Sequence, residues 1–160
     1  MVSQLKVNEI ITQSGSTLTL GKSGDTISAA SGVSANFAGV KMADLWRQNA
    51  DTAISAATET VLASNWEQAD TDSFGVIGSA MTQSSGIFTF PETGIYLLIF
   101  NCQIHSPSQG ATYAGGIIQT TTDNGTYSNA AEGYNSIYHS NGYGIVTIYH
   151  QFDVTSTSTH

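Results

Sequence analysis

The sequence predicts an all-β protein built from antiparallel strands, and three observations support this class. Ser and Thr make up a quarter of the 160 residues, 20 of each, and the β-branched residues Thr, Val and Ile favour strands. Apolar and polar residues alternate along several short segments, as they do in half-buried strands. Turn sequences that contain Gly separate these segments. Several short strands at such spacing indicate a β-sandwich or jelly roll.

The first 39 residues differ in composition from the rest of the chain. Residues 1–35 contain no aromatic residue, and their apolar residues alternate in pairs such as Leu5/Val7 and Leu18/Leu20. One copy of this segment buries too little apolar surface to offset a conformational entropy of roughly 1–2 kcal/mol per residue. We therefore expect residues 1–39 to wind with identical neighbours into a fibrous β-shaft. A flexible leader is the alternative.

The segment 40–50 has the helical spacing of apolar residues. One face of the expected helix carries Met42, Leu45, Trp46 and Asn49. Asp44 lies in the first turn, where the helix dipole favours an acid. A helix of fewer than three turns is marginal alone, so Trp46 is expected to pack on a neighbour. Residues 40–57 are predicted to be a helical neck and linker.

From residue 58 to residue 160 the pattern predicts an antiparallel head. The expected strands are Glu59–Ala63, Phe74–Met81, Ile87–Phe90, Gly94–Ile104, Tyr113–Thr120, Ser136–His139 and Gly144–Val154. Turn sequences such as Asn124-Gly125 separate them, and Asn-Gly is a strong tight-turn signal.

Two of the expected strands, Gly94–Ile104 and Gly144–Val154, carry apolar side chains on both faces. A strand of this kind must be covered on two sides. The chain has only one expected helix, so another subunit is the simplest structure that could cover the second face of these strands. The residues expected between subunits are Leu5, Val7, Leu18, Leu20, Trp46, Ile95, Leu97, Ile99, Ile145 and Tyr149.

Residues 86–100 read Gly-Ile-Phe-Thr-Phe-Pro-Glu-Thr-Gly-Ile-Tyr-Leu-Leu-Ile-Phe and resemble the central hairpin of the C1q/tumour-necrosis-factor-like jelly roll. The residues that fall where this family places them are Phe88, Pro91, Gly94 and Tyr96. Residues 42–47 and 70–75, with the N-terminal segments LKVNEI and TLTLGKSGDTIS, look like parts of tail-fibre proteins of marine bacteriophages.

This resemblance implies a homotrimeric phage tail-fibre or appendage protein with a C1q-like head. Its place would be the virion, after synthesis in the host cytoplasm, and its role host-surface attachment by binding. The implied partners are other tail or virion proteins, through the N-terminal segment, and a host cell-surface glycan or protein. Two alternatives stay open: a purely architectural virion component that joins or decorates other proteins, and a polysaccharide depolymerase.

The charge pattern argues against two other partners. Four basic residues, all within the first 47 positions, face twelve acidic ones, for a net charge of −8. Binding to nucleic-acid phosphates requires clustered Lys and Arg, so nucleic acid is not an expected partner. The longest apolar run, Ile95–Phe100, has six residues and is too short to span a membrane. Membrane insertion is therefore not expected.

The sequence carries no motif for catalysis, and we expect no enzyme, no cofactor and no metal. The histidines lack metal-ligand spacing, and His150 is expected to be a packed or interface imidazole. Glu67, Asp70 and Asp72 have alternating oxygen ligands of the kind that suit Ca²⁺, but an exposed, solvated loop is the preferred interpretation. Cys102, inside an apolar strand, is expected to be a small buried hydrophobe.

The loops after residue 105 are rich in Tyr, Asn, Gly and Ser, and they are the candidate recognition surface. Tyr offers flat apolar area plus one hydroxyl, which suits carbohydrate or protein surfaces. The alternative is that these are ordinary strand aromatics. The candidate recognition residues are Asn124, Tyr127, Tyr134, Asn141 and Tyr143.

In the C1q-like pattern two more strands normally follow the one that corresponds to Gly144–Val154. Here the polar residues 155–160 follow instead. We therefore expect an open sandwich with unpaired backbone at an inner edge. Either the chain is a portion of a longer protein, or a neighbouring chain supplies the missing strands.

Overall fold

The structure is a computed structural model, and it describes residues 22–26 and 39–160. The chain divides into two compact units, Met1–Gly39 and Val40–His160. In the first unit, residues 22–26 form a turn in which the Asp25 N–H donates to the Lys22 carbonyl at 2.9 Å.

The expected β-shaft falls almost entirely on residues outside the described ranges. The same holds for the expected subunit contacts at Leu5, Val7, Leu18 and Leu20. These expectations stay predictions.

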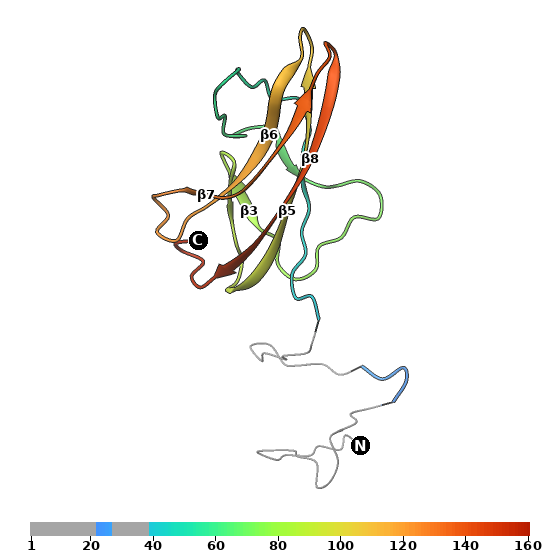
Figure 1. The fold of residues 1–160 in the computed structure, drawn as a ribbon. Coiled ribbons are helices and arrows are strands. Elements are labelled where there is room, and N and C mark those ends of the chain that lie inside the picture. The colour runs from blue at the N-terminus through green and yellow to red at the C-terminus, as the bar shows by residue number, and fades with distance from the viewer. Residues whose placement is uncertain (1–21, 27–38) are drawn as a thin grey trace, which may run out of the picture. The chain divides into compact units, whose positions relative to one another are not determined.

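The unit Val40–His160 is built from strands, and no helix occurs within residues 40–160 (Figure 1). The strands are β1 (Trp46–Gln48), β2 (Trp66–Gln68), β3 (Thr82–Ser84), β4 (Ile87–Thr89), β5 (Gly94–Ser106), β6 (Ala111–Thr120), β7 (Ser128–Ile137) and β8 (Gly142–Val154). They form four antiparallel pairs: β1 with β2, β3 with β4, β5 with β8, and β6 with β7. The predicted all-β class and antiparallel pairing are confirmed.

The longest ladder joins β5 to β8. Every residue from Gly94 to Ser106 pairs in register with a residue between Val154 and Gly142, without a bulge. Side chains alternate strictly along both strands: Val154 and Ile148 are buried, whereas their neighbours in sequence are exposed. Because the side-chain period of a strand is two, this register fixes which apolar set faces inward. The predicted division of both strands into two apolar faces is confirmed.

The β6–β7 pair packs on the inner face of the β5–β8 pair through two glycines. Gly116 and Gly133 are register partners across β6 and β7. A Cβ atom added at Gly116 would lie 2.6 Å from the Phe100 ring, and one at Gly133 would lie 2.7 Å from Val146. The missing side chains therefore make room for the large residues of β5 and β8, which is a common reason for Gly inside a strand.

An aromatic cluster closes one end of the β5–β8 pair. Phe90, Phe152 and Val154 are buried together, with half-buried apolar neighbours around them. The Phe90 ring centroid lies 4.6 Å from that of Tyr96 and 5.8 Å from that of Phe152. The Tyr96 hydroxyl donates to the Glu92 carbonyl at 2.9 Å, which ties the turn before β5 to the strand itself.

The predicted helix over residues 40–50 is wrong, because this segment is extended and contains β1. Its side chains contact residues of other strands. The Trp46 ring packs edge-on against Phe88 at 5.6 Å, and β1 pairs with β2. Leu45, placed on the apolar helical face, is 57% exposed. A helix under three turns is marginal, so strand pairing and tertiary contacts override the helical spacing.

Two predicted strands, Glu59–Ala63 and Phe74–Met81, are also wrong. Glu59–Ala63 forms no strand, and Phe74–Met81 contributes only an isolated bridge between Ile77 and Ala43. Left-handed backbone at Gly78, with φ of 71°, interrupts the extended conformation within Phe74–Met81.

The short β3–β4 hairpin that follows turns through Ser85-Gly86, and both residues have positive φ. This is the two-residue loop geometry that suits the twist of paired strands.

The strand predicted at Ser136–His139 begins eight residues earlier and ends two residues earlier than expected, at Ser128 and Ile137. The sequence did not reveal the first part of this strand, because its small and polar residues show little alternation of apolar and polar side chains. Gly133, which has no side chain, occupies one of the inward positions.

The edges of the β5–β8 pair are open within the described part of the chain. Neither strand has a second ladder partner among residues 40–160. The Asn135 amide of β7 donates to the Ile145 carbonyl of β8 at 3.3 Å, so one side-chain contact reaches this edge. The expectation that a neighbouring chain supplies further strands agrees with this open pairing and stays a prediction.

We predict that Gly116→Ala destabilises the protein by about 1–3 kcal/mol, because the new methyl group overpacks the contact with the Phe100 ring. The measurement is urea unfolding at a fixed protein concentration. Gly75 is the matched control, since nothing lies within 4 Å of an added Cβ there. Gly75→Ala should be neutral or stabilising by about 0.4–1 kcal/mol. Equal stability of the two variants would contradict the glycine-mediated packing.

Candidate functional site

The outer face of the β5–β8 pair carries a group of exposed apolar side chains. We use "outer face" for the side chains of β5 and β8 that point away from β6 and β7. Its exposed apolar residues are Ile95 (69%), Leu97 (66%), Ile99 (60%), Ile145 (59%) and Tyr149 (61%). These are the residues of both strands that the sequence placed between subunits.

The ladder register places an apolar row on β5 beside a more polar β8, with Gln151 opposite Leu97 and Asp153 opposite Ile95. Ile99 stands opposite Tyr149, and Leu97 stands next to Ile99 on the same side of β5. Thr147 and Asn101 form a side-chain contact of 3.5 Å at the middle of the face. Of the twelve outward positions in the two strands, only Asp153 carries a full charge. Low charge and long apolar side chains are typical of a buried interface core.

Trp46, also expected between subunits, packs inside its own chain. Its indole Nε1 donates to the Asp44 carboxylate at 3.0 Å, and its ring lies against Phe88. Asp44 also accepts hydrogen bonds from the Gln68 amide at 2.7 Å and from the Met81 N–H at 2.9 Å. Burial acts to raise the pKa of Asp44, but these hydrogen bonds outweigh it, and the net pKa is lowered. Trp46 thus belongs to a structural network around Asp44.

The acidic segment considered for Ca²⁺ is not wholly the exposed loop that the sequence indicated, because Glu67 is half-buried in β2 and binds Arg47 of β1. The Arg47 guanidinium donates to Glu67 and to Asp70, both at 2.7 Å. Hydrogen bonds from Arg47 and then from Asn49 lower the pKa of Glu67. Residues 22–26 and 39–160 contain no group of three or more His, Cys, Asp and Glu side chains that could hold a metal ion.

Two further residues named from the sequence lie on the inner face of the β5–β8 pair. Cys102 is half-buried there, and burial raises the pKa of its thiol. His150 is also half-buried, with its ring centroid 6.0 Å from that of Phe152. Both positions agree with packed side chains.

The predicted recognition residues lie at the two ends of β7 and along it. Asn124 and Tyr127 precede β7, whereas Asn141 and Tyr143 follow it. A ten-residue strand spans roughly 30 Å, so these two groups do not form one contiguous surface. Tyr143 stacks on His105 with ring centroids 4.4 Å apart, at the end of the outer face.

The loop at Asn124 is rigidly organised by Asp123. The Asp123 carboxylate accepts hydrogen bonds from the Thr126 N–H at 2.7 Å, from the Gly125 N–H at 2.9 Å and from the Thr121 hydroxyl at 2.9 Å. These bonds lower the pKa of Asp123 to about 2. The Asn124 N–H donates to the Thr159 carbonyl at 3.1 Å and so attaches the C-terminal residues to this loop.

A second cluster, on the outward side of the β6–β7 pair, was only partly found from the sequence. Tyr134 of β7 lies perpendicular to Tyr113 of β6, with ring centroids 5.5 Å apart. The Tyr134 hydroxyl donates to the Glu132 carboxylate at 3.0 Å. This bond raises the pKa of Tyr134, with smaller contributions from burial and from the charges of Glu132 and Glu59. Glu132 and Tyr134 are two positions apart, so in a strand they lie on the same face. The sequence did not reveal this pair, because it did not show that β7 starts at Ser128.

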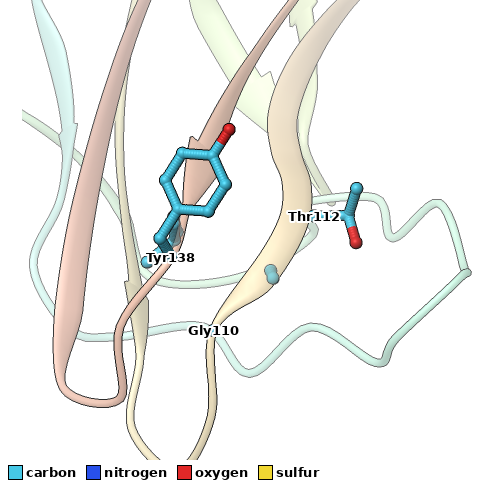
Figure 2. Close-up of a pocket in the computed structure, with 5 residues that line it drawn as sticks. Gly110, Thr112 and Tyr138 are labelled. Carbon is cyan, nitrogen blue, oxygen red and sulfur yellow. The ribbon is translucent and has the colours of Figure 1, made fainter.

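A shallow depression of about 270 Å³ lies at the end of the β6–β7 pair. Figure 2 shows Tyr138 and Thr112 on either side of it, with Gly110 between them. The register pair Ala111 and Ile137 completes its lining. The Tyr138 side chain is 82% exposed, so the depression is open to solvent on that side.

Comparison of the chain with protein-family models, with curated proteins and with solved structures finds no match. In the part of the chain that the structure describes, no helix is long and apolar enough to cross a membrane.

We predict that the Asp123 carboxylate titrates with a midpoint near pH 2. Because its pKa is lowered in the folded loop, its stabilisation of the loop is fully present above about pH 4 and is lost as the pH falls through about 2. The measurement is an NMR pH titration that follows the Asp123 side-chain carboxyl and the Gly125 amide. In Asp123→Asn the Gly125 amide should show no such step. A midpoint near 4 in the native protein would contradict the hydrogen-bonded geometry.

Proposed function

We propose that the protein is a homotrimeric structural component of a bacteriophage virion, a tail fibre or appendage, that attaches to the host surface by binding. The single observation that carries the proposal is the uncovered apolar outer face of the β5–β8 pair. The resemblance of residues 86–100 to the C1q/tumour-necrosis-factor-like hairpin supports the threefold assembly. The resemblance of residues 42–47 and 70–75 and of the N-terminal segments to phage tail-fibre proteins supports the virion role.

The outer face supports association between copies of the chain. Monomeric proteins rarely expose large contiguous apolar patches, and such patches mark interaction sites. Ile95, Leu97 and Ile99 form an unbroken row along β5, with Tyr149 across the ladder. Burying a side chain that is about two-thirds exposed contributes roughly 1–2 kcal/mol. The chain therefore gains substantially when a second copy covers this face.

The geometry around the resembling hairpin agrees with the same proposal. β4 ends at Thr89, a turn of four residues follows, and β5 begins at Gly94. Phe90 and Tyr96 pack on each other across that turn, so Tyr96, one of the residues that carry the resemblance, packs against the core at this end of the β5–β8 pair. A stable, preorganised head on a fibrous segment suits a protein that acts by binding.

We predict that Tyr149→Asp dissociates the assembly while leaving the head folded. Tyr149 is 61% exposed in a single chain, so the substitution costs the fold little, whereas a buried charge at a subunit contact is strongly unfavourable. Sedimentation equilibrium should give three chain masses for the native protein and one for the variant. Circular dichroism should show that both are folded.

Asn141→Gly is the control for this experiment. Asn141 has φ of 57°, a value that Gly adopts freely, and it lies in the turn before β8. This variant should sediment as the native protein does. A native protein that sediments as a folded monomer at micromolar concentration would contradict the proposal, and a mass of two chains would contradict the threefold assembly.

A further inference from the structure

The Tyr134 ring lies in a fixed position on the outward side of the β6–β7 pair. Its register partner on β6 is Gly115, which has no side chain. A Cβ atom at Gly115 would lie 2.5 Å from Cδ1 of Tyr134, so the ring rests against the β6 backbone where a side chain is missing. Tyr113 packs perpendicular to it, and Glu132 holds its hydroxyl.

Much of this cluster is nevertheless exposed to solvent. Tyr134 is 49% exposed and Tyr113 is 69% exposed. A rigid, exposed aromatic ring costs little entropy when it binds a ligand. We call Tyr113, Tyr134 and Glu132 the tyrosine platform.

The chemistry of the platform restricts its ligand. An ionised carboxylate only accepts hydrogen bonds, so the ligand must present donors to Glu132. The negative faces of aromatic rings attract groups with partial positive charge, such as the C–H groups of a sugar ring. Residues 48–160 contain nine acidic residues and no Lys or Arg. A ligand that carries carboxylate, sulfate or phosphate is therefore repelled by this part of the chain.

We propose that the tyrosine platform binds an uncharged pyranose ring of a host-surface glycan, with the ring stacked on Tyr134 and a sugar hydroxyl donating to Glu132. This inference rests on the proposed role in host attachment and names the class of receptor. The complementarity is twofold: apolar C–H groups meet the aromatic face, and hydroxyl donors meet the carboxylate.

The test is saturation-transfer NMR of the full-length protein with a panel of methyl hexopyranosides as probes. Methyl glucuronide is the anionic comparison, and choline chloride is the cationic one. At least one uncharged glycoside should bind, with the strongest saturation on the protons of one ring face. Tyr134→Ala and Glu132→Gln should each weaken its affinity roughly tenfold, since each removes a stacking contact or a charged hydrogen-bond acceptor.

Ile54→Ala is the control, because Ile54 is 47% exposed, close to the 49% of Tyr134, and lies outside β6 and β7. It should leave the affinity unchanged. Glycoside binding that survives the Tyr134 and Glu132 variants, or falls equally in the Ile54 variant, overturns the site. Binding of choline or of methyl glucuronide in place of every uncharged glycoside overturns the ligand class.

Absence of binding to every probe also overturns the inference. Sedimentation of the same samples distinguishes this failure from that of the proposed function. A trimer that binds no glycoside refutes only the platform, whereas a monomer refutes the assembly as well. Trimers of the Tyr134 and Glu132 variants would show that any loss of binding is local.

Discussion

The in-register ladder between β5 and β8 is the constraint on which the rest of the unit Val40–His160 depends. Thirteen consecutive residue pairs without a bulge fix the direction of every side chain in both strands. One apolar set, with Ile148 and Val154, is buried against the rest of the chain. The other set, with Leu97 and Tyr149, is directed outward. A shift of the register by one residue would exchange the two sets, so core and outer face are determined together.

The segment before β3 is held together by charged side chains more than by strands, and its Trp46 and Trp66 rings contact Phe88 of β4. β1 and β2 have three residues each, too few to hold a segment of this length by pairing alone. Asp44 accepts hydrogen bonds from three separate parts of the segment, and Arg47 connects to Glu67 and Asp70. Hydrogen bonds to charged groups are stronger than those between neutral groups. These contacts explain how a segment with few apolar residues keeps a defined backbone conformation with little regular secondary structure.

The sequence predicted the parts of the fold whose residues alternate strictly. β5 and β8 were found to within two residues at each end, and their two faces were assigned correctly. It failed where a few tertiary contacts decide the backbone. The spacing around Trp46 indicated a helix, because nothing local reveals that Asp44 binds residues more than twenty positions away. β7 was shortened because Gly133 interrupts its pattern, although that glycine is what lets the two strand pairs approach.

The candidate sites were predictable to a different extent. The outer face could be predicted because an excess of apolar residues on both faces of a strand is visible in one sequence. The tyrosine platform could not, because it depends on the pairing of Gly115 with Tyr134 across two strands. Neither the glycine nor Glu132 carries a signal alone. Only the register shows that the ring rests where a side chain is missing.

Hydroxyl-radical footprinting of the native protein tests most directly whether the outer face is covered by another copy. In a single chain Tyr149 is 61% exposed and Tyr138 is 82% exposed, so an unassembled protein should label the two tyrosines to a similar extent. If copies of the chain cover the outer face, Tyr149 and Leu97 are labelled several-fold less than their exposure in one chain predicts, while Tyr138 remains fully reactive. Labelling of Tyr149 in proportion to its single-chain exposure would contradict the account.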